Sequence, residues 1–424
     1  MREAETPTRT TIEAVWRIEA PRLIGGLVRV VRDVDRAEDL AQEALLTALE
    51  RWPETGIPDN PGAWLMTTAK NRAVDAARRR AMMEQKHVEI AHTVSESTTL
   101  DVEAIDESVG DDVLRLMLIS CHPVLSKDAR VALTLRLIAG LSTAEIGRAF
   151  LTTEVTMAQR IVRAKRTLSE AKVPFELPSG DALRARIPPV LEVVYLIFNE
   201  GYTATIGDGW LRPELCEEAM RLGRTLVGLV PDDAEAHGLV ALMELQASRT
   251  RARVAANGEP VLLSAQDRSR WDRLLITRGL AALEQAETRK RPLGPYTLQA
   301  AIAACHARAR TTEETEWVRI VALYDALVEL TGSPVVELNR AVAVSMAFGP
   351  AEGLSLVDAL LHEPALRDYH LLPAVRADFL VRLGRPAEAK AEFEKAAGLT
   401  LNGRERELLL ARALGCARET EPAN

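Results

Sequence analysis

Apolar residues recur at intervals of three and four along most of this chain, whereas runs of alternating β-branched residues are few. Such spacing places the apolar side chains on one face of an α-helix. Hydrophobic residues make up 47% of the 424 residues and aromatic residues only 4%, so aliphatic side chains must fill most of the core. This composition favours packed helices over sheets. The sequence therefore predicts an all-α protein with about two to four domains.

The sequence shows no sign of export or of a membrane anchor. No apolar run approaches the roughly 20 residues that span a bilayer, and the segment MREAETPTRTTIEAVW lacks the apolar centre of a signal peptide. We therefore expect a soluble, cytoplasmic protein that does not contact a membrane. The four cysteines lie far apart, which argues against a disulfide framework.

Nothing in the sequence predicts catalysis. Cys121-His122 and Cys305-His306 lack further ligands at zinc-type spacing, so we expect no metal and no cofactor. The seven histidines are scattered, and no G-x-S-x-G, P-loop or paired-histidine motif is present. We therefore assign no catalytic residue and expect a protein that is not an enzyme. A hydrolase in the C-terminal half is a rival that would need activity from residues 180–424 alone.

Charge divides the first part of the chain. Residues 88–112 contain eight acidic residues and no lysine or arginine, a composition that predicts a solvated linker. This linker would separate a first helical unit (10–87) from a second (113–173). Residues 113–172 hold ten basic and four acidic residues, although the whole chain has a formal net charge of −8. The second unit is therefore a basic part of an acidic protein.

The second unit carries the signals of a helix-turn-helix. Ser142 and Glu145 form a capping box that predicts a short helix over about 143–150, followed by a turn at 151–153. The last helix should bury an apolar stripe made of Met157, Ile161, Ala164 and Leu168. Its other side carries residues that could reach base edges and phosphates in a major groove, namely Gln159, Arg160, Arg163, Lys165 and Arg166. The alternative is a basic, solvated helix in a three-helix bundle.

The first unit contains two predicted helices with different faces. The helix over 37–52 has a core stripe of Ala41, Leu45, Ala48 and Trp52 and exposes Asp39, Gln42 and Glu43. That acidic face is either solvated surface or a docking face for a basic partner. The helix over 60–80 begins at the cap Asn60. It has a narrow apolar stripe (Leu65, Ala69, Ala73, Ala76) and places Asn71, Asp75, Arg78 and Arg79 on another face.

In combination, these segments resemble the bacterial extracytoplasmic-function (ECF) sigma factors of the sigma-70 family. The resemblance is carried in order by DLAQEALLTALERW, NPGAWLMTTAKNRAVDAARRR, the acidic linker, LSTAEIGRAF and TMAQRIVRAKRTL. YLIFNEGY, QDRSRWD, GPYTLQAAIAACHA and PVVELNRAVAVSMAFGPAEGL are similar to a subfamily with a C-terminal helical-repeat extension. The resemblance implies a factor that directs core RNA polymerase to promoter DNA, so both are expected partners.

The resemblance also implies roles for individual residues. Asp39, Gln42 and Glu43 would face the clamp helices of the polymerase. The loop 53–60 and the helix after it would open the −10 element, through Asn60, Trp64, Asn71, Asp75, Arg78, Arg79 and Arg80. The −35 element would be read by Thr156, Gln159, Arg160, Arg163, Lys165 and Arg166. Ala158 stands where the family often has a basic residue, which shifts reading to its neighbours. Trp64 is either a core residue or a wedge beside the opening duplex.

The part after a proline-rich break at 173–189 predicts a helical-repeat domain over 180–424. Residues 347–360 and 382–396 resemble each other at a spacing of about 35 residues, the period of tetratricopeptide-like repeats. Such arrays present concave surfaces, so this part could hold a regulatory protein. We expect the arginines between 249 and 273 to be solvated or paired with Asp267 and Asp272. A helix-turn-helix regulator with a sensing repeat domain is the remaining alternative, although it leaves the first unit unexplained.

Overall fold

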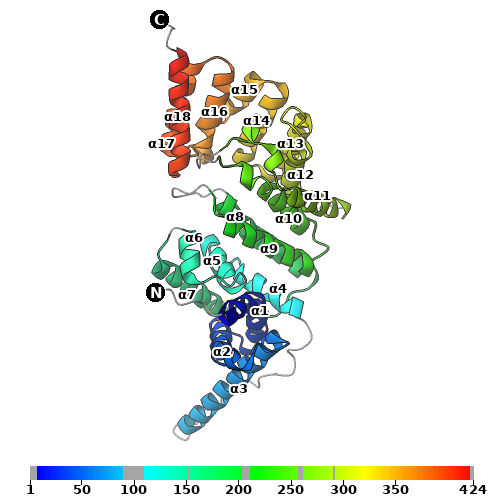
Figure 1. Cartoon of the computed structure of the whole chain (residues 1–424), viewed down its shortest axis with the longest axis vertical. Helices are drawn as coiled ribbons and strands as arrows, with labels where there is room; N and C mark the ends of the chain where they lie inside the picture. The colour runs from blue at the N-terminus through cyan, green and yellow to red at the C-terminus, as the bar shows by residue number, and fades with distance from the viewer. Residues whose placement is uncertain are drawn as a thin grey trace. The chain divides into compact units, whose positions relative to one another are not determined.

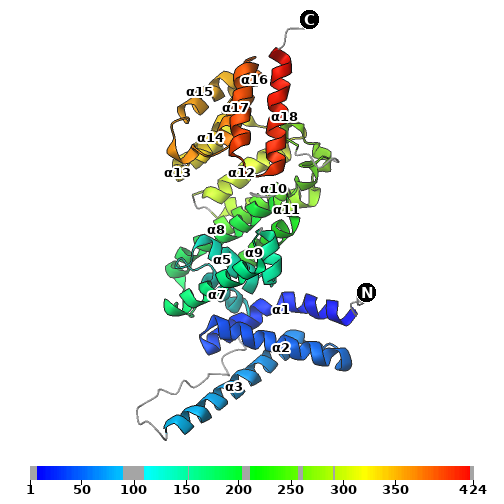
Figure 2. The same cartoon turned by 90° about the vertical axis from the view of Figure 1, so that its left-hand side faces the viewer.

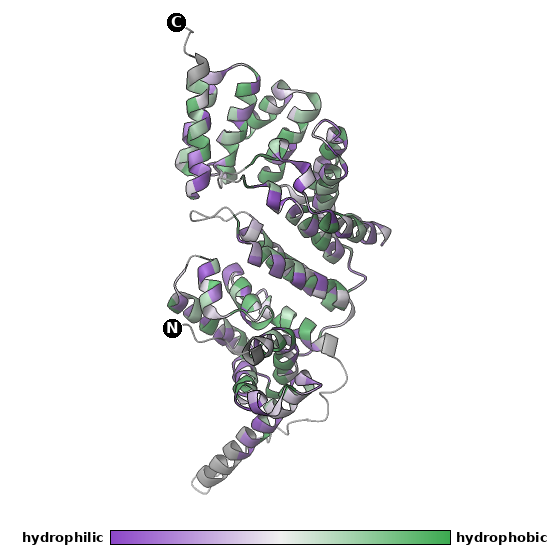
Figure 3. Ribbon diagram, viewed as in Figure 1, coloured by the Kyte–Doolittle hydropathy of each residue, from purple (hydrophilic) through white to green (hydrophobic). Residues whose placement is uncertain are grey.

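The computed structural model describes residues 7–88, 109–150, 152–202, 211–255, 261–289 and 292–420. The predicted all-α fold is confirmed, since every regular element in these ranges is a helix (Figures 1 and 2). The chain divides into two compact units, residues 1–194 and 195–424. Hydrophobic and hydrophilic residues lie on different faces of the same helices in both units (Figure 3). The fold therefore follows from the amphipathic patterns in the sequence.

Unit 1 (residues 1–194) begins with a bundle of three helices. The helices of this unit are α1 (Pro7–Val31), α2 (Val34–Thr55), α3 (Pro61–Val88), α4 (Val109–Ser120), α5 (Lys127–Leu137), α6 (Thr143–Ala149), α7 (Glu154–Glu170) and the first half of α8 (Gly180–Tyr202). The Asp33 side chain caps α2, and Ala41, Ala48 and Trp52 are buried as predicted. α3 packs on α1 and α2 through its first half and then projects away from them (Figures 1 and 2). The −10 candidates on α3 are thus held by a rigid base.

The acidic linker ends earlier than the sequence predicts. α4 begins at Val109, and Asp112 is 3% exposed and forms an ion pair with Arg115. α4 packs on α1, where a Cβ atom at Gly25 would lie 2.3 Å from the carbonyl oxygen of Asp112. The end of the predicted linker is therefore part of a buried helix, in which the charge of Asp112 is compensated by Arg115. Asp111 also lies in α4, and the other six acidic residues of the linker lie outside the described residues.

The predicted helix-turn-helix is confirmed in its local detail. Ser142 and Glu145 form the capping box of α6, and the Thr153 side chain caps α7 by accepting a hydrogen bond from the backbone of Thr156. The predicted stripe on α7 is buried, with all four side chains at most 5% exposed: Met157, Ile161, Ala164 and Leu168. These caps satisfy backbone donors at both helix starts and so fix where each helix begins.

The predicted break at 173–189 is wrong in its second half. α8 runs through Pro188 and Pro189, and the two residues whose carbonyl groups lose a helical bond, Arg184 and Ala185, are exposed. The first half of this helix belongs to unit 1. Its Glu192 pairs with Lys127 at 2.6 Å and with Arg130 at 3.1 Å. The boundary between the units therefore falls inside α8, at residues 194 and 195.

Unit 2 (residues 195–424) is a succession of helices in which neighbours along the chain pack together. They are the second half of α8, α9 (Pro213–Leu229), α10 (Ala234–Ala247), α11 (Arg273–Thr288), α12 (Pro295–Arg308), α13 (Trp317–Thr331), α14 (Pro334–Phe348), α15 (Pro350–Ala359), α16 (Leu371–Arg382), α17 (Pro386–Leu399) and α18 (Gly403–Thr420), with short 3-10 turns at 250–252, 263–265, 268–270 and 364–366.

The two sequence segments that resemble each other occupy equivalent places in this array. α15 and α17 each begin at a proline after a glycine-containing turn, in which Gly349 and Gly384 have positive φ angles. Each packs on the helix before it, α14 or α16. The helix-turn-helix pairs expected of repeats are therefore present, while the tetratricopeptide-like classification stays a prediction. Among the residues that the structure describes, no helix is long and apolar enough to cross a bilayer.

Candidate nucleic-acid and protein interface

The outer face of α7 is a polar surface on a fixed helix. Thr156, Gln159, Arg163 and Arg166 are exposed, and Arg160 is half-buried with its guanidinium 3.7 Å from the Asp128 carboxylate. Arg166 forms an ion pair with Glu170 of the same helix at 2.6 Å. Because the opposite face is anchored in the core, these side chains point out of the protein together. Five of the six predicted −35 residues therefore share one accessible surface.

Two valines complete this surface and were missed from the sequence. Val155 is 68% exposed and Val162 is 62% exposed. With Gln159 and Arg166 they follow intervals of three and four, so all four residues lie on the outermost line of the helix. Apolar side chains at such places can contact the methyl group of thymine in a major groove. In the sequence, Val155 and Val162 fall on a predicted helix face whose other residues are polar, and this pattern could have identified both valines.

A surface hollow of about 430 Å³ lies between α7 and the start of α5. Gln159, Arg160 and Arg163 line it from α7, opposite Ser126 and Ala129. Ser126 is the N-terminal cap of α5, so its helix end faces the same side as the arginines. Backbone donors at a helix start and arginine side chains both favour an anion. This part of the surface is therefore electrostatically suited to a nucleic-acid phosphate.

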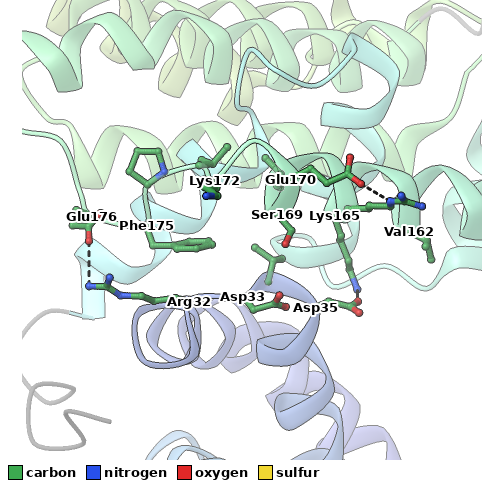
Figure 4. A pocket seen from close by; sticks show the side chains of 15 residues that line it. Arg32, Asp33, Asp35, Val162, Lys165, Ser169, Glu170, Lys172, Phe175 and Glu176 are labelled. Carbon is green, nitrogen blue, oxygen red and sulfur yellow. Dashed lines mark hydrogen bonds and ion pairs between the residues drawn. The ribbon is translucent and has the colours of Figure 1, made fainter. Parts of the chain in front are cut away.

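Lys165 differs from the other predicted −35 residues. Its side chain is only 11% exposed, and its Nζ lies 2.7 Å from both Asp35 Oδ1 (Figure 4) and Glu38 Oε2 of α2. Burial lowers the pKa of Lys165, but Glu38 and Asp35 more than offset this, and the net shift is upward. The ammonium group is therefore charged and held inside unit 1. In this arrangement it does not face the outer surface of α7.

The predicted acidic face of α2 is present, and part of it already contacts other side chains of the protein. Asp39 and Glu43 are exposed, whereas Gln42 is half-buried and donates a hydrogen bond to Glu38 at 2.8 Å. Burial and the neighbouring carboxylates of Asp35, Glu38 and Glu43 raise the pKa of Asp39. The concentration of negative charge suits a basic partner. Glu38, which the sequence did not single out, is the buried member of this group.

The −10 candidates lie along α3. Asn60 is its cap, accepting a hydrogen bond from the backbone of Ala63 at 3.1 Å, and Asn71, Asp75 and Arg78 are exposed. The side chains of Arg79 and Arg80 lie outside the described residues. Trp64 is half-buried and meets the buried Trp52 edge to face, with ring centroids 5.3 Å apart. Trp64 is therefore part of the packing between α2 and α3, as the core interpretation predicted.

One cation on α3 was missed. Arg72 donates to Glu43 at 2.8 Å and to the Thr47 hydroxyl at 2.8 Å, both on α2. It thus connects the helix that carries the −10 candidates to the acidic face of α2. The predicted loop 53–60 is also shorter than expected, because α2 continues through Pro53 to Thr55. Only residues 56–60 separate the two helices.

In each of the two Cys-His pairs, one residue is buried and contacts other side chains. Cys121 is buried, its Sγ lies 3.3 Å from the Thr134 hydroxyl, and burial raises its pKa to about 12. His306 packs edge to face on Trp317, and burial, with Arg249 and Arg268, lowers its pKa to about 3. Within the described ranges, no three His, Cys, Asp or Glu side chains group as metal ligands do.

The arginines of residues 249–273 are not uniformly solvated, contrary to expectation. Arg268 is 8% exposed and donates to the carbonyl groups of His306 and Ala309 and to the Thr315 hydroxyl. The carboxylates expected to pair with these arginines instead cap helices, since Asp272 accepts from the start of α11. Arg268 thus joins a 3-10 turn to the end of α12. Glu200 at the end of α8 forms an ion pair with Arg212.

Comparisons with protein families match all three parts of the chain. Residues 16–82 match the family described as sigma-70 region 2, and residues 115–168 match sigma-70 region 4. Residues 186–287 match a family of unknown function, DUF6596. The first two matches cover the bundle with the −10 candidates and the helix-turn-helix, respectively. The third begins inside α8 and covers the start of unit 2.

Three relatives match either most of this chain or about a third of it. An uncharacterized protein of Rhizobium meliloti (strain 1021) is 43% identical over 389 residues, which are 91% of each chain. RNA polymerase sigma factor CarQ of Myxococcus xanthus is 36% identical over 138 residues, 32% of this chain and 74% of the relative. ECF RNA polymerase sigma factor SigK of Mycobacterium ulcerans (strain Agy99) is 30% identical over 151 residues, 35% of this chain and 78% of the relative. With both sigma regions matched in order, the chain belongs to the ECF group of the sigma-70 family of RNA polymerase sigma factors.

Proposed function

We propose that this sigma factor recruits core RNA polymerase through α2 and recognises promoter DNA through α3 and α7. The observation that carries the proposal is the outer face of α7, where Gln159, Arg163 and Arg166 are exposed on a helix capped and anchored as a reader helix would be. Such a factor is not a catalyst, because RNA synthesis belongs to the polymerase, and it works in the cytoplasm with the polymerase and the promoter.

The −35 element would be read in the major groove. Gln159 and Arg160 can donate to base edges, Val155 and Val162 can contact thymine methyl groups, and Arg163 and Arg166 can neutralise phosphates. Thr156 lies in the first turn, where its hydroxyl is 2.8 Å from that of Thr153. That position suits a phosphate contact at the edge of the groove. Reading would thus combine direct base contacts with charge neutralisation.

The −10 element would be opened along α3. Asn71, Asp75 and Arg78 are exposed along this helix, and Arg79 and Arg80 extend its basic end in the sequence. Asn60 marks the start of the helix, and Trp64 would fix its position on α2. Capturing an unstacked base costs a few kcal/mol, which stacking and polar contacts offset. A rigid α3 helps because its side chains need not be ordered at the moment of capture.

Core polymerase would dock on Asp39, Gln42 and Glu43. The surface is acidic, and in this family it faces the clamp helices of the largest subunit, as the resemblance implies. Complementary charge would accelerate encounter and fix orientation. Arg72 of α3 forms an ion pair with Glu43, so a movement of Glu43 on docking would also move α3.

We further propose that unit 2 regulates the factor by holding another protein. Its helices form an array, and such arrays offer extended surfaces for protein partners. The test compares the full chain with residues 1–202, a cut that keeps Glu192 paired with Lys127 and Arg130. A change in promoter output that a partner protein reverses or amplifies supports the role. Identical output from both chains, with every tested partner, contradicts it.

The main test maps transcription start sites in vitro. Core polymerase transcribes pooled genomic fragments from the host bacterium, with and without the protein, and the RNA 5′ ends are sequenced. We expect protein-dependent starts preceded by two shared elements, and Arg163→Ala should weaken them. If the same starts occur with and without the protein, the proposal fails. Binding to a DNA element without any polymerase-dependent start would instead favour a helix-turn-helix regulator.

A further inference from the structure

Cationic and aromatic side chains meet inside unit 2. The Arg249 guanidinium carbon lies 6.0 Å from the centroid of the Tyr202 ring and 5.9 Å from that of the Trp271 ring. The Arg268 guanidinium carbon lies 5.1 Å from the same Trp271 centroid. Tyr202 comes from the end of α8, Arg249 follows α10, and Arg268 belongs to the 3-10 turn at 268–270. We define the arginine–aromatic cluster as Arg249, Arg268, Tyr202, Trp271 and the nearby His306 of α12.

The two arginines of the cluster lack the kind of partner that arginines elsewhere in unit 2 have. Arg249 donates to the amide oxygen of Gln246, and Arg268 donates to two backbone carbonyl groups and to the Thr315 hydroxyl. Within the described ranges, neither arginine forms an ion pair with a carboxylate. Other half-buried arginines of the unit do so, namely Arg212, Arg224, Arg340, Arg376 and Arg412. The positive charge of the cluster therefore has no counter-charge in contact with it among these residues.

Three buried polar atoms of the cluster have no hydrogen-bond partner in the described part of the chain. They are Arg249 Nε, the indole nitrogen of Trp271 and Nδ1 of His306. Trp271 is 3% exposed and His306 is 8% exposed, so bulk water is largely excluded from both. Such atoms are uncommon in folded proteins, because removing a polar group from water without a new bond costs free energy. A guanidinium and an indole only donate, so the partner that would satisfy them is an acceptor.

The electrostatic environment of the cluster favours an anionic acceptor. Burial, Arg249 and Arg268 lower the pKa of His306 to about 3, so this side chain is neutral near pH 7. Burial and Arg249 also lower the pKa of Arg268, and they outweigh the opposite effect of Glu313 and Glu314. A negative charge at this place would be attracted by both arginines in surroundings that screen the attraction little.

We propose that the arginine–aromatic cluster binds the carboxylate of a small organic acid, with Arg249 and the Trp271 indole as its donors. Hydrogen bonds between a guanidinium and a carboxylate are charge-assisted and stronger than neutral ones. The rings of Tyr202 and Trp271 lie on either approach to Arg249 and offer apolar surface to the body of the acid. Arg253, whose guanidinium carbon lies 3.7 Å from the Tyr202 centroid, adds a third cation nearby.

A small molecule suits this place better than a segment of another protein. Two of the three unpartnered atoms belong to side chains that are at most 8% exposed, so the acceptor has to enter between side chains. Arg249 and Tyr202 are half-buried, which leaves the cluster reachable from solvent. The inference concerns unit 2 alone and does not depend on the roles proposed for α2, α3 and α7. Its failure and the failure of the proposed function are therefore separate results.

The first experiment measures binding of three carboxylates, namely benzoate, phenylacetate and succinate, to the full chain. At about a hundred times its dissociation constant, a bound acid should raise the unfolding temperature of unit 2 by about 5–10 °C. Benzamide has the shape of benzoate without the charge and should have no effect. Inorganic phosphate at the same ionic strength tests charge without an apolar body. The proposal fails if none of the three acids stabilises the protein, if benzamide equals benzoate, or if phosphate alone binds.

Two matched variants test whether Arg249 makes the contact. Arg249→Met keeps a long side chain without its charge, and Arg251→Met makes the same change at an exposed arginine two residues away. Calorimetric titration should show the binding acid weakened by at least about tenfold in Arg249→Met and unchanged in Arg251→Met. Equal weakening in both variants would reveal a general effect of net charge and refute the site.

The stability of the free variants separates a binding arginine from a structural one. Arg249→Met should unfold at the same temperature as wild type or higher, because it removes a partly buried charge that has no contacting counter-charge. Arg268→Met should unfold at a lower temperature, because the carbonyl groups of His306 and Ala309 lose their donor. A loss for Arg249→Met as large as that for Arg268→Met would identify Arg249 as a structural residue and contradict the proposal.

The indole N–H of Trp271 reports where the acid binds. The chain has six tryptophans, and Trp271→Phe identifies the Trp271 signal in a nuclear magnetic resonance spectrum of the 15N-labelled indoles. The acid should move that signal downfield, as a new hydrogen bond to a carboxylate does, and should leave it in place in Arg249→Met. Movement of another indole signal with an unchanged Trp271 signal would place the acid elsewhere and overturn the assignment.

Discussion

The rings of Trp52 and Trp64 meet edge to face, with centroids 5.3 Å apart, where α3 begins to pack on α2. Trp52 is 1% exposed, so it supplies a fixed wall, and Trp64 is half-buried against it. Edge-to-face aromatic pairs add stability beyond the area they bury. The pair therefore sets the angle at which the exposed half of α3 leaves the bundle.

Trp64→Ala should destabilise unit 1 by about 2–4 kcal/mol, because it removes an aromatic contact and leaves a cavity. Urea unfolding of the full chain, followed by circular dichroism, checks this value. Trp64→Phe should recover most of the loss. If Trp64 is instead a wedge in the duplex, Trp64→Ala will leave unfolding unchanged and abolish strand opening, as permanganate footprinting would show.

The outer face of α7 should divide into base-reading and phosphate-binding residues. Gln159→Ala and Val162→Ala should change the preferred −35 sequence and cost about 1–3 kcal/mol at individual base pairs. Arg163→Ala should weaken binding similarly for all sequences. Selection of bound duplexes from a randomised −35 library measures both effects. Equal loss at every sequence for all three variants would contradict the division.

Gly25 should tolerate no side chain, because α1 and α4 approach closely there. A Cβ atom would lie 2.3 Å from the Asp112 carbonyl oxygen, so Gly25→Ala should destabilise unit 1 by about 1–3 kcal/mol. Gly415 is the matched control, since a Cβ atom there meets nothing within 4 Å. Gly415→Ala should stabilise its helix by up to about 1 kcal/mol. Opposite signs in thermal unfolding confirm the close approach, and equal signs disprove it.

Unit 2 should lose stability in mild acid because of His306. Burial, together with Arg249 and Arg268, lowers the pKa of this side chain to about 3 in the folded protein, against 6.5 when unfolded. Between these values the unfolded chain binds the extra proton. Stability therefore falls as pH drops from about 6.5 toward 3, by at most about 1.4 kcal/mol per pH unit.

His306→Gln should flatten that part of the pH profile, although it can lower the stability at pH 7. The control is His362→Gln, which makes the same change at an exposed histidine of unit 2. Urea midpoints measured at several pH values between 4 and 7 provide the comparison. A His306→Gln profile as steep as that of wild type would show that other groups cause the acid sensitivity.

Structural features that depend on residues close together in the sequence, such as helix caps, could be predicted. Ser142, Glu145 and Thr153 signal helix starts through bonds to residues three positions away, and the structure has those bonds. The buried stripe of α7 follows from helical period alone. Even the limits of α6 agree with the expected range of about 143–150, since the helix spans Thr143–Ala149.

Features that depend on distant parts of the chain were not predictable. Lys165 meets Asp35 across 130 positions, and nothing in the local pattern around either residue indicates a partner. The same holds for Glu192, whose partners on α5 make the first half of α8 part of unit 1. Pro188 and Pro189 predict a break because each removes a helical hydrogen bond. The helix continues because the residues whose carbonyl groups lose that bond are exposed, which depends on the fold. These contacts depend on which distant residues meet in the fold, and a single sequence does not show that.

The burial of the thiols has a consequence for how signals can reach this factor. All four cysteines are buried, and burial raises the pKa of Cys121 and of Cys216 to about 12. Peroxides and electrophiles attack the thiolate, which is scarce at such a pKa and shielded from solvent here. Direct oxidation of these four thiols in the folded chain is therefore disfavoured.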